Sequence, residues 1–165
     1  MKYFEHLAQG KQPYIGYKLL CLLNKYGIVK SVWTTNFDGL VERAAHNAFI
    51  TPICINLDCA DRIYRTESSN ELLCISLHGD YKYSTLKNTS KELDSQHPTF
   101  VAALKRYFND KNLIVIGYSG RDKSLMSALT EAFSEKGSGR IYWCGYGNEI
   151  SSDVSTLLRL SLIHI

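Results

Sequence analysis

The sequence predicts an α/β sandwich, in which helices cover both faces of a mostly parallel sheet. Short segments rich in β-branched and aromatic residues alternate along the chain with helical patterns of about 10–14 residues, as parallel strands and their right-handed crossovers require. Of the 165 residues, 45% are hydrophobic and 21% are charged, which excludes a disordered or collagen-like chain. A chain of this length needs only one hydrophobic core, so residues 1–165 are expected to form a single domain.

The first third of the chain predicts a helix, a strand and a second helix. Apolar residues recur at helical spacing over 14–26, and the fixed φ of Pro13 suits a first helical turn. The β-branched and aromatic segment 28–34 predicts a strand. A second helix is expected over 38–49, with Asp38 placed to accept hydrogen bonds from its first N–H groups.

The middle third predicts two further strands, at 52–56 and 72–77. The polar segment between them ends in a turn-like sequence at 67–70. The stretch 81–97 is polar and shows no period, which indicates a surface loop.

The last third continues the alternation. A helix is expected over 98–109, a fully apolar strand over 113–117, a helix over 122–135 and a strand over 140–144. Ser151 is placed to cap one more helix. Together the segments predict a Rossmann-like three-layer sandwich.

Composition excludes several classes of protein. The net charge of +3 is small and basic residues are scattered among acidic ones, so no nucleic-acid partner is expected. The five cysteines are irregularly spaced and contain no C-x-x-C pair, which argues against a disulfide framework and a zinc site. No apolar run approaches the about 20 residues of a membrane span, and the first residues lack the apolar core of a signal peptide. We therefore expect reduced thiols, a cytoplasmic location and no membrane partner.

Three predicted strands end in polar or glycine-rich motifs. The motifs are Thr34-Thr35-Asn36-Phe37-Asp38, Leu77-His78-Gly79-Asp80 and Gly117-Tyr118-Ser119-Gly120-Arg121-Asp122. Each by itself has an ordinary structural explanation, as a helix-capping turn or a structural histidine. The carboxyl ends of parallel strands share one edge of a sheet, and ligands of open α/β sheets bind at that edge. We therefore expect the three motifs to converge on one site.

As a set, these motifs resemble those of sirtuin-like NAD-consuming domains, specifically the bacterial SIR2-like domains of anti-phage defence proteins. Thr34-Thr35-Asn36-Phe37-Asp38 is similar to the T-T-N-[FY]-D of that branch, whose counterpart in protein deacylases is T-Q-N-I-D. Leu77-His78-Gly79 matches the L-H-G that holds the catalytic histidine, and Ile116-Gly117-Tyr118-Ser119 with Asp122 matches I-G-Y-S-x-x-D. The resemblance covers roughly residues 12–147 and implies a partial sirtuin fold.

The resemblance implies cleavage of NAD to nicotinamide and ADP-ribose. It implies catalytic roles for Asn36 and His78 and NAD-binding roles for Thr35, Asp38, Gly117 and Ser119. The residue types suit this chemistry, because the Asn36 amide can hold a water or a ribose hydroxyl and the His78 imidazole can act as a general base. Gly117 allows a close backbone approach, and Ser119 offers a hydroxyl to ribose or phosphate. Asp38 either binds the nicotinamide side or only caps its helix, and Asp122 is expected to be a cap.

Two departures from the sirtuin pattern shape the remaining expectations. Sirtuins begin with a G-A-G-x-S loop that binds the NAD pyrophosphate, and this sequence contains no such loop. We therefore expect the chain to be part of a longer protein, to bind NAD weakly by itself and to form a homo-oligomer through its parent. Deacylases carry two C-x-x-C pairs where residues 81–112 contain no cysteine, so no metal is expected. NAD-dependent deacylation and a non-catalytic nucleotide-binding or assembly domain are the alternatives.

Overall fold

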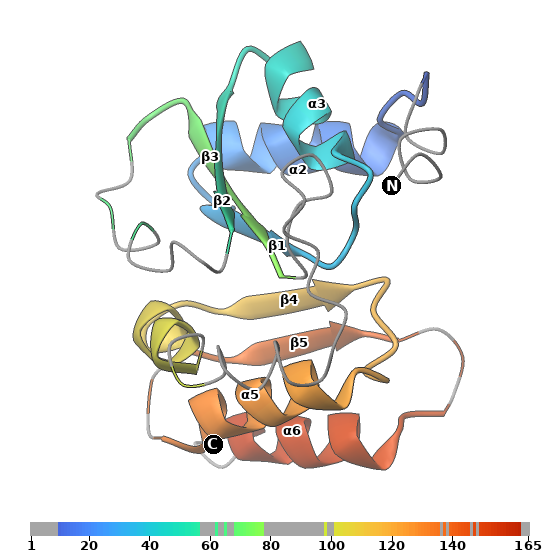
Figure 1. Cartoon of the computed structure of the whole chain (residues 1–165), viewed down its shortest axis with the longest axis vertical. Coiled ribbons are helices and arrows are strands. Elements are labelled where there is room, and N and C mark those ends of the chain that lie inside the picture. Colours follow the sequence, from blue (N-terminus) through green and yellow to red (C-terminus); the bar gives the residue numbers. More distant parts are fainter. Residues whose placement is uncertain are drawn as a thin grey trace. The chain divides into compact units, whose positions relative to one another are not determined.

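The chain divides into two compact units, Met1–Thr89 and Ser90–Ile165 (Figure 1). The computed structural model describes residues 10–56, 62, 65, 68–77, 98, 101–135, 137, 139–145, 147 and 149–162. Among the described residues, helices alternate with strands in the second unit and over 15–56 of the first, and the strand pairs are parallel. The α/β class and the Rossmann-like parallel connections predicted from the sequence are therefore confirmed.

The first unit holds a three-stranded sheet with the order β1-β3-β2. Its elements are α2 (Ile15–Lys25), β1 (Ser31–Thr34), α3 (Leu40–Asn47), β2 (Thr51–Asn56) and β3 (Glu71–Ser76). In the register of the sheet, Ser76 of β3 pairs with Thr34 of β1 and with Asn56 of β2. The carboxyl ends of the three strands therefore lie level at one edge, which is the edge where the sequence places its polar motifs.

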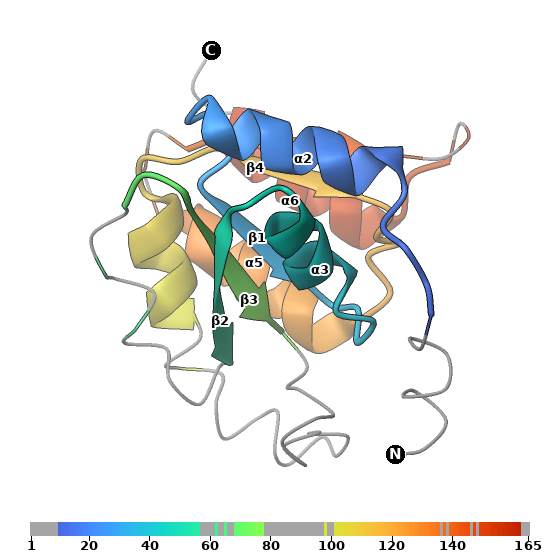
Figure 2. The ribbon, with the colours of Figure 1, turned by 90° about the horizontal axis from the view of Figure 1, so that it is seen from above.

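Both helices of the first unit pack on its sheet (Figure 2). The packed face is formed by a cluster of small and aliphatic side chains from α2, α3, β3 and the residue before β2, namely Cys21, Val41, Ala44, Ala45, Ile50, Leu72 and Cys74. Leu72 is fully buried, and burial of one such side chain stabilises a fold by roughly 1.5–3 kcal/mol. Helix α3 thus attaches to the sheet through a buried apolar face, whereas α2 buries Cys21 and leaves Leu19 and Leu22 exposed.

Boundaries in the first unit differ from the sequence prediction by up to three residues, most at the start of β1. The helix α2 begins at Ile15 with Tyr14 as its N-cap, so Pro13 precedes the helix instead of occupying its first turn. The strand β1 begins at Ser31 and not at residue 28. The backbone N–H groups of Ile28 and Val29 donate to the Leu23 carbonyl, so these two residues complete the end of α2 and are not available to the sheet.

The second unit holds a two-stranded parallel sheet of β4 (Leu113–Ile116) and β5 (Ile141–Cys144). The chain is helical over 101–108, within the predicted helix, and α5 (Lys123–Ser134) and α6 (Ser152–Leu162) follow the two strands. The helix α6 packs against both α5 and β5 (Figure 1). The last helix begins as predicted, because the Ser151 hydroxyl accepts a hydrogen bond from the Val154 N–H at 3.3 Å.

Some sequence predictions concern residues outside the described ranges. These include the surface loop over 81–97, His78 and most of the polar segment between β2 and β3, whose turn-like end is described from residue 68 onward. Of that segment, Asn70 has a positive φ of 68°, as asparagine in a turn often does, and its carbonyl accepts a hydrogen bond from the Thr51 N–H. Across the described ranges, no helix has both the length and the apolarity needed to span a bilayer.

Candidate functional site

The first motif forms the loop that leaves β1 and leads to α3. The backbone N–H of Asn36 donates to the Thr34 hydroxyl at 3.0 Å, which turns the chain immediately after the strand. Thr35 is partly buried in this turn, whereas Asn36 is exposed. The turn therefore presents the Asn36 side chain at the surface, at the carboxyl edge of the sheet.

The second motif begins beside the first. The N–H of Leu77 donates to the carbonyl of Thr34 at 2.9 Å, which extends the pairing of β1 and β3 by one residue beyond Ser76. Leu77 is buried and directly precedes His78 in the chain. The structure therefore brings the first motif next to the residue before His78, while His78 itself lies outside the described residues.

Asp38 has a structural contact of its own. One oxygen of its carboxylate accepts a hydrogen bond from the Leu40 N–H at 3.0 Å, at the start of α3. A carboxylate at this position satisfies a helix N–H that has no partner within the helix, and it interacts favourably with the helix dipole. The N-cap of α3 is Gly39, so Asp38 binds the first helical N–H from the residue before the cap, and its NAD-binding role stays a prediction.

A tyrosine that the sequence reasoning did not select approaches the same loop. The Tyr17 ring packs against the buried cluster beneath α2, and its phenol is close enough to Asn36 and Asp38 for both to affect its pKa. Burial raises the pKa of Tyr17, the nearby Asp38 carboxylate raises it further, and the contact with Asn36 opposes the increase. Tyr17 lies within the predicted helix over 14–26, and no local sequence signal connects it to Asn36.

The third motif lies in the second unit, between β4 and α5. Gly117 and Gly120 both have positive φ values, 69° and 72°, which residues with a Cβ adopt at a cost. Gly120 is buried, and a Cβ built on it would lie 2.6 Å from Cγ2 of Val154. Gly117 is exposed and such a Cβ would meet no atom within 4 Å. The loop is thus packed at Gly120 and open at Gly117.

Tyr118 of the same loop packs against β5. Its ring centroid lies 5.9 Å from that of Trp143 on β5. Burial raises the pKa of Tyr118 to about 12, and the Asp122 carboxylate contributes to the increase. Ser119, the next residue, is exposed. The contact between the Tyr118 and Trp143 rings therefore holds the loop against β5, while Gly117 and Ser119 are exposed and accessible to a ligand.

Asp122 is the N-cap of α5, as predicted. Its carboxylate accepts hydrogen bonds from the N–H groups of Ser124 and Leu125 at 3.1 and 3.2 Å, and from the Ser124 hydroxyl at 2.7 Å. The N–H groups at a helix N-terminus are a common phosphate site. Here the Asp122 carboxylate occupies two of them, so the start of α5 does not offer these groups to a phosphate.

The predicted site residues are thus divided between the two units. Thr35, Asn36 and Asp38 belong to the first, and Gly117 and Ser119 belong to the second. Within the first unit the sheet register brings two of the three motifs to one edge. The third motif lies at the carboxyl end of β4, the corresponding end of its own strand.

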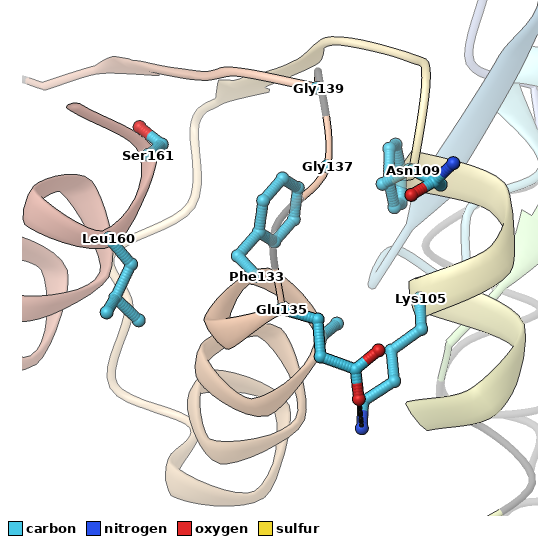
Figure 3. Close-up of a pocket in the computed structure, with 10 residues that line it drawn as sticks. Lys105, Asn109, Phe133, Glu135, Gly137, Gly139, Leu160 and Ser161 are labelled. Carbon is cyan, nitrogen blue, oxygen red and sulfur yellow. Dashed lines mark hydrogen bonds and ion pairs between the residues drawn. The ribbon is translucent and has the colours of Figure 1, made fainter. Parts of the chain in front are cut away.

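A small cavity in the second unit contains none of the predicted site residues (Figure 3). Its volume is about 60 Å³, room for about two water molecules, whereas cavities for drug-sized ligands have about 300–1,000 Å³. Lys105 and Glu135 form an ion pair at its wall, with 2.7 Å between Nζ and Oε1. The cavity is therefore too small to hold a dinucleotide.

The described ranges contain thiols but no disulfide. Within them, no three His, Cys, Asp or Glu side chains form a group that could hold a metal ion. The cysteines there are free thiols, with Cys21 and Cys74 buried and Cys54 and Cys144 exposed. Burial is the main cause that raises the pKa of both Cys21 and Cys74, so these two thiols stay protonated at neutral pH.

Comparison with known proteins supports the reading of the motifs. A family model described as a SIR2-like domain matches residues 30–163, a range that includes all three strand-end motifs. No curated protein matches the chain. Because the family model covers most of the sequence, the chain belongs to the SIR2-like domain family.

Proposed function

We propose that the protein is an NAD⁺ hydrolase that cleaves the bond between nicotinamide and ribose. Its membership of the SIR2-like family, which includes NAD-dependent enzymes, supports the use of NAD. One observation carries the proposal further. The 2.9 Å hydrogen bond from the Leu77 N–H to the Thr34 carbonyl puts the loop with Asn36 beside the position that precedes His78. An amide and an imidazole at neighbouring strand ends are suited to activate one water molecule.

The proposed reaction is NAD⁺ + H₂O → nicotinamide + ADP-ribose + H⁺. Cleavage develops positive charge at the anomeric carbon of the ribose, and the electron pair of the broken bond leaves with nicotinamide. Asn36 holds the attacking water below that carbon, and its exposure makes the amide accessible to substrate. His78 accepts the proton of the water as it attacks, since an ordinary imidazole, with a pKa of about 6.5, is a suitable base at neutral pH.

The remaining predicted residues are assigned to substrate binding. The open side of Gly117 and the exposed Ser119 hydroxyl suit contacts with ribose or phosphate. Thr35, which directly follows β1, is assigned to binding of the same substrate. One oxygen of Asp38 already accepts a hydrogen bond from the Leu40 N–H, so its second oxygen is assigned to the amide of nicotinamide.

The biological part of the proposal follows from the motifs. The T-T-N-F-D and I-G-Y-S-x-x-D sequences resemble those of bacterial anti-phage defence proteins. We therefore assign the protein to abortive infection in the bacterial cytoplasm, where loss of NAD stops growth of an infected cell. It acts as a homo-oligomer, with neither nucleic acid nor membrane as a partner.

Product analysis on the natural protein tests the proposal. With saturating NAD, chromatography should detect nicotinamide and ADP-ribose in equal amounts. His78→Ala should lower the rate by about 10²–10⁴-fold, the usual contribution of a positioned acid or base. Asn36→Ala should lower it with little change in melting temperature, because truncation of an exposed amide opens no core cavity. His46→Ala, an exposed histidine on α3, is the matched control and should leave the rate unchanged.

Three results would contradict the proposal. Normal turnover of His78→Ala would remove the proposed base. A strict requirement for an acetyl-lysine peptide, with the acetyl group transferred to ADP-ribose, would make the protein a deacylase. Calorimetric binding of NAD without product would identify the non-catalytic alternative.

A further inference from the structure

Helix α2 is attached to its sheet by one of its two faces. Nδ2 of Asn24 donates hydrogen bonds to the Val29 carbonyl at 2.9 Å and to the Glu71 carbonyl, at the start of β3, at 3.2 Å. Cys21 is buried in the cluster that covers the sheet, and Leu20 packs against this cluster. These contacts fix the rotation of α2, and they therefore also decide which side chains its opposite face presents.

The opposite face of α2 is apolar and exposed. Four large side chains form an apolar stripe along it, with exposed fractions of 69%, 52%, 47% and 75% for Ile15, Leu19, Leu22 and Tyr26. Tyr26 is the C-cap, and its N–H still donates to the Leu22 carbonyl, so it continues the helical turn. Single apolar residues are common on protein surfaces, but a continuous exposed stripe is typical of an interaction site.

The spacing of the apolar stripe indicates the shape of its partner. Successive residues of the stripe are four, three and four positions apart. This is the heptad spacing with which one helix packs along another. An extended peptide presents its side chains with a period of two and does not match this spacing. The 11 residues of α2 span about 16 Å at about 1.5 Å per residue, so about three turns of a partner helix fit along the stripe.

The charges beside the apolar stripe are positive. Lys18 and Lys25 are exposed, and they directly precede Leu19 and Tyr26, so both lie on the same flank of the stripe. The sequence of α2 contains no Asp or Glu. Residues on the flanks of a helix pair form ion pairs across it and select the partner. A second copy of α2 would bring lysines and no carboxylate, whereas an acidic helix would pair with both lysines.

We propose that the exposed face of α2 is a docking site for an acidic amphipathic helix of a partner protein. The partner helix places apolar side chains on the stripe with the same heptad spacing, and Asp or Glu side chains beside Lys18 and Lys25. Removal of apolar area from water supplies the affinity, and the two lysines select against helices with basic flanks. Docking does not depend on NAD cleavage, because no residue of the stripe is assigned to the reaction.

Fluorescence anisotropy with two labelled peptides tests the site in the natural protein. Both peptides consist of three heptads with leucine at positions a and d. They differ only at positions e and g, which are glutamate in one peptide and lysine in the other. In about 50 mM salt the glutamate peptide should bind at least about tenfold more tightly than the lysine peptide, and about 0.5 M salt should reduce this ratio, because salt screens exposed charges.

Two double variants locate the binding surface. Leu19→Ser with Leu22→Ser should weaken binding of the glutamate peptide by at least about tenfold, with the circular dichroism spectrum unchanged, because both side chains lie on the exposed face. Ile150→Ser is the matched control, since Ile150 is 58% exposed and lies outside α2, and it should bind like the wild type. Lys18→Glu with Lys25→Glu should reverse the preference between the two peptides.

Other occupants of this face give different results, and each would overturn the proposal. Equal binding of the two peptides at low salt, or no binding of either, would exclude an acidic helix. A dimer in sedimentation that Leu19→Ser with Leu22→Ser dissociates would make the face a contact between two copies. Binding to vesicles of phosphatidylcholine and phosphatidylglycerol that is lost in the same double variant would make it a membrane contact.

Discussion

Replacement of Gly120 by alanine should destabilise the second unit much more than the same replacement at Gly117. The two glycines lie in one loop and have nearly the same backbone conformation, with φ of 72° and 69°. They differ in the space that a Cβ atom would occupy. A Cβ on Gly120 would lie 2.6 Å from Cγ2 of Val154, whereas a Cβ on Gly117 would have no neighbour within 4 Å. The pair therefore separates a packing effect from a backbone effect.

The expected magnitudes follow from these two contributions. A side chain in the left-handed region costs roughly 1–2 kcal/mol, and this cost applies equally to both variants. The optimal separation of two carbon atoms is about 3.5–4.0 Å, so the Gly120 variant must also displace Val154 or the loop. Overpacking of this kind costs about 1–3 kcal/mol. Gly117→Ala should thus lose about 1–2 kcal/mol of unfolding free energy, and Gly120→Ala about 2–5 kcal/mol.

Urea unfolding followed by tryptophan fluorescence can measure the difference. The chain has two tryptophans, and Trp143 would lie 3.4 Å from the new Cβ, so a Trp33→Phe background makes Trp143 the reporter. Variants should have equal m-values and midpoints separated in the stated order. Equal losses at the two positions would show that α6 adjusts to the added methyl group without cost, and the packing argument would be refuted.

Two further predictions concern the ends of the same loop. Asp122→Ala should reduce the unfolding free energy by about 0.5–2 kcal/mol, because the Ser124 and Leu125 N–H groups lose their acceptor. Asp122→Asn keeps an acceptor and should lose less. Equal losses of the two variants in urea unfolding would contradict the capping role of Asp122. Because the pKa of Tyr118 is raised from 10.0 to about 12, the folded protein keeps this proton where the unfolded chain releases it, so stability should fall as pH rises from about 10 to about 12. Tyr118→Phe should flatten this part of the pH profile, and an unchanged slope would show that Tyr118 is not its cause.

The sequence was sufficient for the class of fold and for most of its elements. The helical spacing that predicted 14–26 corresponds to α2, and the apolar run at 113–117 corresponds to β4. Asp122 was recognised as a cap from its place before an apolar helix. These features are local, because side chains three or four residues apart determine the apolar face of a helix and the residue before its first turn determines its cap. The predicted start of β1 at residue 28 was wrong, because the N–H groups of Ile28 and Val29 donate to the Leu23 carbonyl at the end of α2. The strand therefore begins only at Ser31.

The candidate site was only partly accessible from sequence. The three motifs and their strand ends were visible, and the general rule for parallel sheets predicted that they share an edge. The particular pairing was not visible. Only the folded chain shows that Thr34 lies opposite Ser76, with the Leu77 N–H on the Thr34 carbonyl. Register depends on which faces of distant strands are buried together, and no segment of the sequence contains that information by itself.

Tyr17 shows most clearly what the tertiary structure decided. In the sequence it is one apolar position of an amphipathic helix, and its ring does pack in the core. It lies close enough to the loop after β1 for Asp38 and Asn36 to affect the pKa of its phenol, because α2 packs on the sheet at a particular rotation and position. Periodicity specifies which side of a helix is buried, but the end of a long side chain is placed by the packing of all the elements around it.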